Sequence, residues 1–357
     1  MSHDLSEHSR RMRDSRSISE MSERFLFFAE ECRSAAPIYT RLSECVAKDE
    51  EMLNLTNEAT SVPLTNLLFG AVHFLLLGGA DHELARFYPS LSERPQSGDS
   101  FPAFKDFCLK HRVEISRILK TRRVQTNEIR RSALLLPAFE TVARRSGLPL
   151  ALVEVGASAG LNLNFDLYAY DYGEAGKLGE DSPLVLECEL RGKAPPLPAA
   201  MPEVARRVGI ELSPVDVSDE EDARWLLALI WPENFRERAE RLRKAVALAR
   251  KHPPDLRAGD ALEILPNVLE ELPERASPLV FHTFTVNQFP EKARKRFREI
   301  MDGHARKHGK LHEVSIGWRP GDEFASISLT EHPGGETNML ARCDAHGEWI
   351  EWLESGA

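Results

Sequence analysis

The stretch LVEVGASAGLNL, from Leu152 to Leu163, decides how the second half of the chain is expected to fold. An apolar run ends in a cluster of small residues and a further apolar segment follows, which is the pattern of a strand, a tight turn and a helix. Gly156 and Gly160 have no Cβ, so the backbone can turn tightly there and a ligand can approach the peptide. Free N–H groups at the helix start can then bind polar atoms of a nucleotide or adenosyl cofactor.

Glu154 is unusual in this strand, because Leu152 and Val155 beside it are apolar and the strand is expected to be buried. A carboxylate in such a place needs a partner. The alternative interpretation of the whole stretch is a plain strand, turn and helix whose small residues serve packing, since a single glycine-rich turn is not specific.

The spacing of Glu154, Gly156 and Gly160, E-x-G-x-x-x-G, resembles the first motif of class I S-adenosylmethionine-dependent methyltransferases, usually written E/D-x-G-x-G-x-G. Ser158 stands where that family has its middle glycine, and it adds a Cβ and a hydroxyl where the backbone passes closest to the cofactor. The resemblance implies S-adenosylmethionine as the cofactor, bound by these four residues.

Composition limits the classes of protein to consider. A length of 357 residues predicts about two domains with a large core, and 42% hydrophobic and 29% charged residues are ordinary for a soluble chain. A net charge of -10 argues against a general nucleic-acid binder. Five dispersed cysteines without a C-x-x-C pair are typical of a reducing compartment, and no apolar run reaches 18 residues. We therefore expect a cytoplasmic protein that binds no nucleic acid and contacts no membrane.

Composition and hydrophobic periodicity divide the chain into three parts. Residues 1–20 are rich in Ser, Arg, Asp and Glu, which predicts a disordered tail. Residues 21–147 have helical periodicity interrupted by Pro and Gly, which predicts an all-α N-terminal domain of five or six helices. From 148 to 357 strand-like runs alternate with helical stretches, as in a doubly wound α/β domain.

The predicted fold is thus an all-α domain followed by a Rossmann-like, class I methyltransferase-type sheet that is mostly parallel. The final strand-like runs, such as LHEVSIGW, FASISLT and MLARCD, have few helices between them, which predicts an antiparallel edge. The runs LYAYDYG and PLVLECELRG, joined by a Gly-rich stretch, are expected to form an inserted hairpin near residues 166–192.

Acidic residues at the ends of other strands are candidates for contacts with the cofactor, because ligands of such sheets bind beyond the carboxyl ends of the strands. Asp216, at the end of IELSPVDV, is placed to accept hydrogen bonds from ribose hydroxyls, although it lies 60 residues after Gly156. Glu187 or Glu189 takes that role if the hairpin strand is the second core strand. The alternative for Asp216 is a turn or a helix N-cap.

Asp260, in RAGDALEIL, resembles the methyltransferase acid that binds the adenine amino group, with Ala261 beside the ring. The alternative is an Asp that caps the following helix. In PLVFHTFTVNQFP, His282 could accept a proton from a substrate nucleophile and Asn287 could orient that nucleophile. A structural His282 is the alternative, because methyl transfer can be achieved by positioning alone.

The block TRRVQTNEIRR interrupts a helical pattern with six polar residues among the seven from Thr121 to Asn127. On a helix, Arg123, Asn127 and Arg130 or Arg131 share one face, which could contact an anionic substrate together with Gln125. The alternative is a solvated face or one that bridges the domains. The motifs H-E-x-x-H and G-x-x-x-x-G-K-[ST] and the Ser/His/Asp spacing are absent from the sequence, so it predicts neither a metal site nor a P-loop or hydrolase.

From about Phe25 to Trp352 the chain resembles a bacterial family of proteins that contain a domain of unknown function. The shared blocks are NLLFGAVHFLLL, HELARFYP, TRRVQTNE, LVEVGASAGLNLNFDLYAYDYG, CELRG and ARWL with its following WPE. This resemblance implies the fold more than a reaction. The expected function is methyl transfer from S-adenosylmethionine to a small-molecule acceptor. The alternatives are a catalytically silent ligand-binding or interaction protein and a different nucleotide-dependent enzyme.

Overall fold

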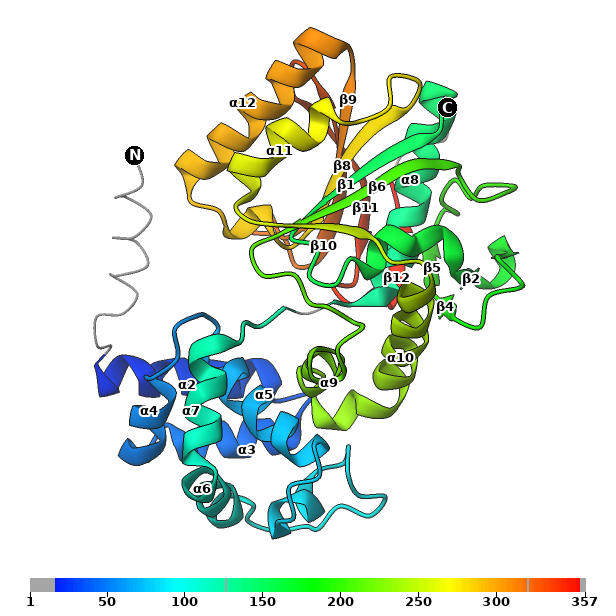
Figure 1. Cartoon of the computed structure of the whole chain (residues 1–357). Coiled ribbons are helices and arrows are strands. Elements are labelled where there is room, and N and C mark those ends of the chain that lie inside the picture. Colours follow the sequence, from blue (N-terminus) through cyan, green and yellow to red (C-terminus); the bar gives the residue numbers. More distant parts are fainter. Residues whose placement is uncertain (1–16, 126, 320, 354–357) are drawn as a thin grey trace. The chain divides into compact units, whose positions relative to one another are not determined.

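The computed structural model describes residues 17–125, 127–319 and 321–353, which form two compact units (Figure 1). The helical unit consists of the described part of Met1–Thr126 together with Ser218–Glu240. The sheet unit consists of Asn127–Val217 and the described part of Arg241–Ala357. Each unit is described by itself below.

The helical unit is built around α5 (Leu64–Leu77), which is apolar on nearly all sides and therefore buried along most of its length. Trp225 of α9 (Glu220–Ala228) packs edge-on against Phe74 of α5, with 6.0 Å between the ring centroids. The other helices are α2 (Ile18–Cys32), α3 (Pro37–Val46), α4 (Glu50–Thr56), η1 (Glu83–Phe87), α6 (Phe101–Lys110), α7 (Arg112–Thr121), α9 (Glu220–Ala228), η5 (Pro232–Asn234) and the start of α10 (Phe235–Lys251).

Helix α2 begins earlier than the sequence predicted. Ser17 and Glu20 form a capping box, in which each side chain accepts a hydrogen bond from the other residue's backbone N–H. The prediction of a disordered tail to residue 20 is therefore wrong for its last four residues, and residues 1–16 lie outside the described part of the chain.

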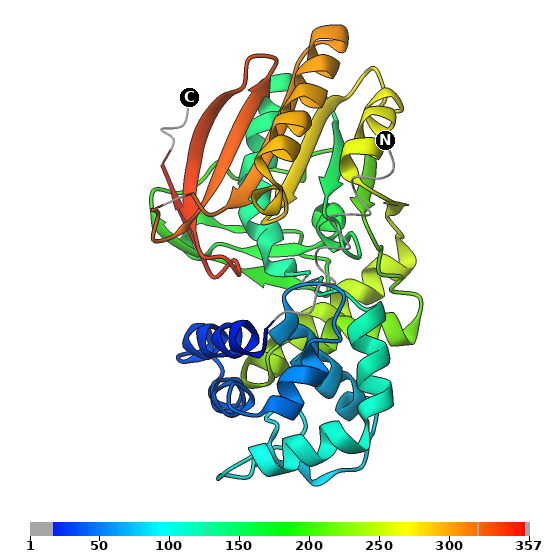
Figure 2. The same ribbon diagram turned by 90° about the vertical axis from the view of Figure 1, so that its left-hand side faces the viewer.

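The sheet unit contains a nine-stranded sheet in the order β5-β12-β11-β10-β9-β8-β1-β6-β7. Its strands are β1 (Leu150–Val155), β5 (Glu189–Gly192), β6 (Val204–Glu211), β7 (Asp255–Ala258), β8 (Ser277–Thr283), β9 (Leu311–Gly317), β10 (Ala325–His332), β11 (Glu336–Cys343) and β12 (Trp349–Trp352). The five strands from β7 to β9 are parallel to one another, whereas β9 to β12 pair antiparallel. Figure 2 shows β10 and β11 side by side at this end of the sheet. A mostly parallel sheet with an antiparallel edge was predicted and is confirmed.

Strand order reverses at β1, which sets the position of a ligand crevice. From β1 the chain proceeds through β6 to β7 on one side, and β8 and β9 then pair on the other side. In open parallel sheets, ligands bind at such a switch point, outside the carboxyl ends of the strands. The residues that follow β1 and β8 are thus the first candidates for a site.

Alternate residues of each strand face opposite layers. Val153 and Val155 of β1 join a core cluster with α11 (Ala261–Glu270) and α12 (Glu291–His308), which cover one face of the sheet. On the other face, Phe281 of β8 packs edge-on against Phe139 of α8 (Ser132–Ser146), with 5.0 Å between the rings. Glu154 is therefore on the α8 face and His282 is on the α12 face.

The predicted hairpin near 166–192 is wrong in its pairing. β2 (Ala169–Asp171) and β4 (Val185–Glu187) run parallel, and the short β3 (Lys177–Leu178) between them in sequence pairs antiparallel with β2. These strands form a separate small sheet, as expected for an insertion, but β5 leaves it and pairs with β12 at the edge of the large sheet.

The boundary between the units also differs from the predicted one at residue 147. Helix α8 belongs to the sheet unit, because its apolar side packs on β8, whereas α9 belongs to the helical unit, where it packs on α5. The helical unit is thus assembled from two separate segments, which the order of elements along the chain does not predict.

Candidate ligand site at the switch point of the sheet

Among the described residues, two other than glycine have a left-handed backbone, and both follow strands at the switch point. Ser158, after β1, has φ 53° and Phe284, after β8, has φ 56°. This conformation costs about 1 to 2 kcal/mol for a residue with a Cβ, and such strain is concentrated at functional sites. Ser158 therefore occupies a position that favours glycine, as the motif implies.

Glycine is required at position 156 by the backbone conformation and by a neighbouring side chain. The φ of Gly156 is +78°, and an added Cβ would lie 2.5 Å from Cγ2 and 2.8 Å from Cβ of Thr285. The space beside this glycine is thus filled by a side chain of the loop after β8. Gly160, with φ +68°, is covered in the same way by Pro254 and Leu256. Close packing of the loops, rather than an open approach for a ligand, accounts for both glycines here.

Glu154 is 2% exposed and has one hydrogen-bonded side chain, Asn162, whose Nδ2 donates to Oε1 over 3.4 Å. Asn162 in turn accepts from Ser132 Oγ at 3.0 Å. Among the described residues, Oε2 of Glu154 has no hydrogen-bond partner. Burial raises the pKa of this carboxyl to about 8, with the charge of Glu211 adding to the effect and Asn162 and Arg131 opposing it. Glu154 is therefore largely protonated at neutral pH.

Arg131 contributes a buried cation close to the end of β8. Its guanidinium lies 4.5 Å from the ring centroid of Phe284 and donates to Thr283 Oγ1 at 3.3 Å and to the carbonyl of Ala345 at 2.9 Å. The sequence prediction named this arginine as one possible member of a polar helix face. It is the residue of the TRRVQTNEIRR block whose side chain contacts the end of β8.

Glu211 is a further candidate that was not predicted from the sequence. This residue ends β6, the strand parallel to β1, and its Oε2 accepts a hydrogen bond from the backbone N–H of Ser158 at 2.9 Å. The signal was present, because VARRVGIE reads as a strand that ends in an acid. It was overlooked because the strand was expected to begin at Ile210 and to continue to Val217.

The acids that were named for the ribose lie elsewhere. Asp216 is exposed in the loop beyond β6, five positions after Glu211. Glu187 is in β4 of the small sheet, and Glu189 begins β5 at the far edge of the large sheet. Neither glutamate follows a strand next to β1, so the alternative that placed them on the second core strand is wrong.

Asp260 follows β7 and caps α11. Its Oδ1 accepts a hydrogen bond from the backbone N–H of Leu262 at 2.8 Å, and Ala261, the first residue of the helix, is buried. The structure therefore confirms the alternative that Asp260 caps the helix that follows it. A role in adenine binding stays a prediction, since the residue also lies at the carboxyl end of a strand beside β6.

We expect Asp260→Ala to destabilise the protein by about 1 kcal/mol, because the first turn of α11 loses its cap. Asp260→Asn is the matched control, since asparagine caps helices equally well, and it should stay within a few tenths of a kcal/mol of the wild type. Chemical denaturation of the three proteins measures this. Equal stability of all three would show that the cap contributes nothing.

His282 is buried on the α12 face, where its ring packs against Phe297. Its Nε2 lies 3.0 Å from Oε1 of Glu313, whose Oε2 lies 3.0 Å from His332, and His332 lies 2.7 Å from Asp302. Burial alone would raise the pKa of Glu313, but its hydrogen bonds with the two histidines outweigh it and lower the pKa to about 2. This buried chain across β8, β9 and β10 favours the structural alternative for His282.

Asn287 follows β8 in a short helix, η6 (Val286–Gln288). Its Nδ2 donates to the carbonyl of Trp318 at 3.1 Å, and its side chain fills the space beside Gly317. The amide thus ties the loop after β8 to the end of β9. Orientation of a substrate by this residue stays a prediction.

The predicted helix face of Arg123, Asn127 and Arg130 or Arg131 is wrong, because α7 ends at Thr121 and the described residues up to Glu128 are not helical. The three residues named for the substrate, Arg123, Gln125 and Asn127, lie in different places. Arg123 is exposed in the helical unit, and its carbonyl accepts from Trp225 Nε1 at 2.8 Å. Gln125 is half-buried in the same unit. Asn127 is in the sheet unit, and its Nδ2 donates to the carbonyl of Ala157 at 3.1 Å. Of the three, Asn127 contacts the glycine-rich turn.

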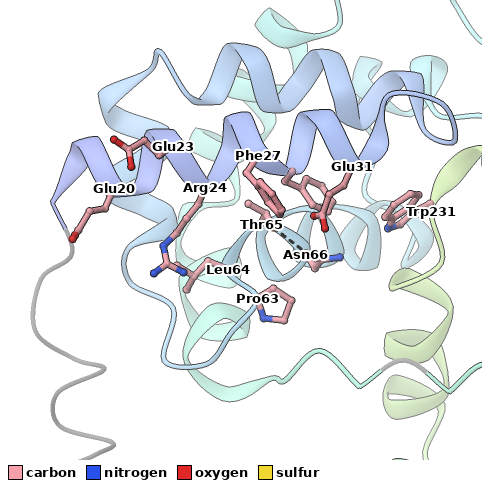
Figure 3. Close-up of a pocket in the computed structure, with 11 residues that line it drawn as sticks. Glu20, Glu23, Arg24, Phe27, Glu31, Pro63, Leu64, Thr65, Asn66 and Trp231 are labelled. Atoms are coloured by element: carbon pink, nitrogen blue, oxygen red, sulfur yellow. Dashed lines mark hydrogen bonds between the residues drawn. The ribbon is translucent and has the colours of Figure 1, made fainter. Parts of the chain in front are cut away.

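A separate pocket of about 740 Å³ lies on the helical unit, between α2 and the start of α5 (Figure 3). None of the predicted site residues lines it. Carboxylates, one arginine and aromatic rings surround it, and the lining consists of Glu20, Glu23, Arg24, Phe27, Phe28, Glu31, Pro63, Leu64, Thr65, Asn66 and Trp231.

The fold and the site define an α/β protein with a helical unit and a large, mostly parallel sheet whose switch point carries buried polar residues. Among the described residues, no helix is long and apolar enough to cross a membrane. The chain belongs to the family described as uncharacterized protein conserved in bacteria (DUF2332), whose sequence profile matches residues 22–352. No curated protein and no solved structure matches the chain.

Proposed function

We propose that the sheet unit binds S-adenosylmethionine beyond the carboxyl ends of β1, β6 and β7, and that the protein transfers its methyl group to a small-molecule acceptor. The observation that carries this proposal is that a glycine-rich turn, Glu211 and Asp260 end three adjacent parallel strands. Because parallel strands end at the same edge, a single extended ligand can reach all three. Glu211 then accepts from the ribose hydroxyls and Asp260 lies beside the adenine.

Methyl transfer requires a nucleophile held in line with the methyl group, and positioning can supply most of the catalysis. Three groups near the turn suit that task. Arg131 offers a buried cation for an anionic acceptor, Asn127 is hydrogen-bonded to the turn, and protonated Glu154 can donate a hydrogen bond. His282 is not needed as a base in this scheme.

A catalytically silent protein is the second candidate, and one observation favours it. Thr285 fills the space beside Gly156, and Glu211 already accepts the N–H of Ser158, so two positions that a cofactor would use have partners within the fold. In this case the sheet serves as a scaffold for ligand sensing or for interaction with another protein.

Calorimetric titration of the full chain with S-adenosylhomocysteine separates the two. The proposal predicts saturable binding, a higher Tm with ligand, and a loss of about 1 to 3 kcal/mol of binding free energy in Glu211→Ala. Glu211→Gln keeps the acceptor for Ser158 but loses the charge, and should be intermediate. Asp216→Ala, five positions away and exposed, is the matched control and should bind like the wild type.

Absence of binding by the wild type would remove the proposal and leave the silent protein. Equal binding by Glu211→Ala and the wild type would remove the ribose role alone. Incubation with methyl-labelled S-adenosylmethionine and a bacterial small-molecule extract then tests for a labelled product. Binding without any labelled product favours a ligand sensor.

A further inference from the structure

Helices α11 and α12 lie side by side (Figure 1). Two histidines near the end of α12 and a glutamate at the end of α11 form a cluster. His304 and His308 are four positions apart on α12 and therefore project from the same face of the helix. Their rings stack with 4.5 Å between centroids and 27° between planes. Glu270, the last residue of α11, faces both rings.

The distances between the ligand atoms suit a metal ion. Nε2 of His308 lies 3.0 Å from Oε1 and 3.1 Å from Oε2 of Glu270, and Nδ1 of His304 lies 3.7 Å from Oε1. Tetrahedral zinc with bonds of 2.0 to 2.2 Å to nitrogen and oxygen separates its ligand atoms by roughly 3.3 to 3.5 Å. The observed distances to Glu270 bracket this value, and the three ligand atoms all lie within 4.8 Å of one another.

The environment of His304 is a second, independent observation that favours a metal ligand at this position. Its side chain is 8% exposed, and the buried Nδ1 atom has no hydrogen-bond partner among the described residues. At 3.7 Å the carboxylate of Glu270 is too distant for a hydrogen bond. In the neutral ring this nitrogen can therefore serve as a metal ligand.

We propose that Glu270, His304 and His308 bind a divalent transition metal of the zinc class, with water as the fourth ligand. Two imidazoles and one carboxylate are ligands that zinc prefers. The site is separate from the switch point, because α12 starts just after β8 and runs about 20 to 25 Å before it reaches these histidines, at 1.5 Å per residue. The metal clamps the ends of two helices and takes no part in the proposed methyl transfer.

Lys307 is the competitor for this site. Its ammonium lies 2.7 Å from Oε2 of Glu270, so that the same helix-end residues can also form an ordinary ion-pair cluster. A bound metal uses the same carboxylate, through Oε1, which faces both histidines, and the lysine charge repels it. Removal of the lysine charge should therefore tighten metal binding, whereas an ion-pair cluster without metal affinity predicts no binding in any variant.

The test is a titration of the chelator-treated full chain with Zn²⁺ against a chromophoric chelator, with Co²⁺ as a spectroscopic probe. We expect one equivalent of saturable zinc and visible Co²⁺ bands typical of a tetrahedral site. His304→Ala and His308→Ala should each weaken zinc binding more than about 100-fold, because even the outer partners of metal ligands contribute about 10- to 100-fold. Lys307→Met should bind several-fold more tightly.

His252→Ala removes an exposed histidine outside the cluster and is the matched control, with unchanged zinc affinity expected. Glu270→Gln keeps the size of the side chain and covers the case in which a histidine variant fails to fold, as checked by circular dichroism. Wild-type protein that binds no stoichiometric zinc would overturn the proposal. So would equal affinity of the wild type, His304→Ala and His308→Ala.

Discussion

Gly156→Ala is expected to destabilise the protein by about 2 to 5 kcal/mol. A left-handed backbone costs about 1 to 2 kcal/mol once a Cβ is present, and overpacking adds about 1 to 3 kcal/mol. Both apply here, because φ is +78° and the new Cβ would lie 2.8 Å from that of Thr285. Chemical denaturation followed by circular dichroism measures the loss.

Gly173→Ala is the matched control. This glycine also has a positive φ, +60°, but nothing lies within 4 Å of an added Cβ, so only the backbone cost applies. The two variants together separate strain from packing. Thr285→Gly should rescue much of the loss in Gly156→Ala, since it removes the clashing side chain. If the double variant is as unstable as the sum of both single variants, the contact with Thr285 is not the cause.

The close packing of Thr285 against Gly156 also determines which variant can test cofactor binding. A bulky residue at Gly156 disrupts the packing of two loops, so loss of ligand binding in such a variant reports on the fold and not on the ligand. Glu211 is the better target, because it is half-buried at the end of its strand and leaves the turn glycines intact.

Glu154→Gln is expected to abolish a component of the pH dependence of stability. The folded carboxyl keeps its proton up to a pKa of about 8, whereas the unfolded one loses it near 4.5. Between these values the native state binds one more proton, so the free energy of unfolding falls as pH rises, by about 1.4 kcal/mol per unit. The loss is complete above the folded pKa and amounts to on the order of 5 kcal/mol.

Glutamine has the same size and stays neutral, so the Glu154→Gln variant does not lose this stability as pH rises. The free energy of unfolding of the variant minus that of the wild type should therefore be larger at pH 8.5 than at pH 5. Glu174→Gln, on an exposed turn, is the control and should follow the wild type. Denaturation curves at half-unit steps of pH measure the effect. Parallel profiles for the wild type and Glu154→Gln would show that Glu154 is ionised in the folded protein and that a cation or a bound ligand stabilises its charge.

Part of the sheet unit was predictable because its central strands are mostly apolar runs. LALVEV and PLVFHTF became β1 and β8, since buried parallel strands need no polar face. Glu154 was recognised as exceptional on the same ground. LHEVSIGW, in which buried and half-buried residues alternate, became β9. The antiparallel edge followed from the lack of helices between the last strand-like runs. Strand β7 was missed, because DLRA is short and half-polar at the edge of the sheet.

The candidate site was predicted only in part. Motif spacing identified the turn from Gly156 to Gly160, and position after a strand identified Asp260. Glu211 was missed because the strand was predicted to continue to Val217, past Asp216, whereas it ends at Glu211. His282 was named for its residue type, but which face of the sheet it occupies depends on the register of β8, and that register places it in a buried chain with Glu313 and His332.

The sequence by itself determined what is local: the strand and turn within residues 152–163, the alternation of strands and helices that follows, and the helical first half. These depend on periodicity and backbone preference, which act over a few residues. The helix expected after this turn is instead the short 3-10 helix η3 (Leu161–Leu167), which is interrupted at Asn164. Only the tertiary structure decided the partition of α8 and α9 between the units, the parallel pairing within the insertion, and the meeting of Glu270 with His304 and His308. Those features depend on contacts between residues far apart in the chain. Burial of apolar surface stabilises contact between any two complementary faces, whatever their separation in sequence.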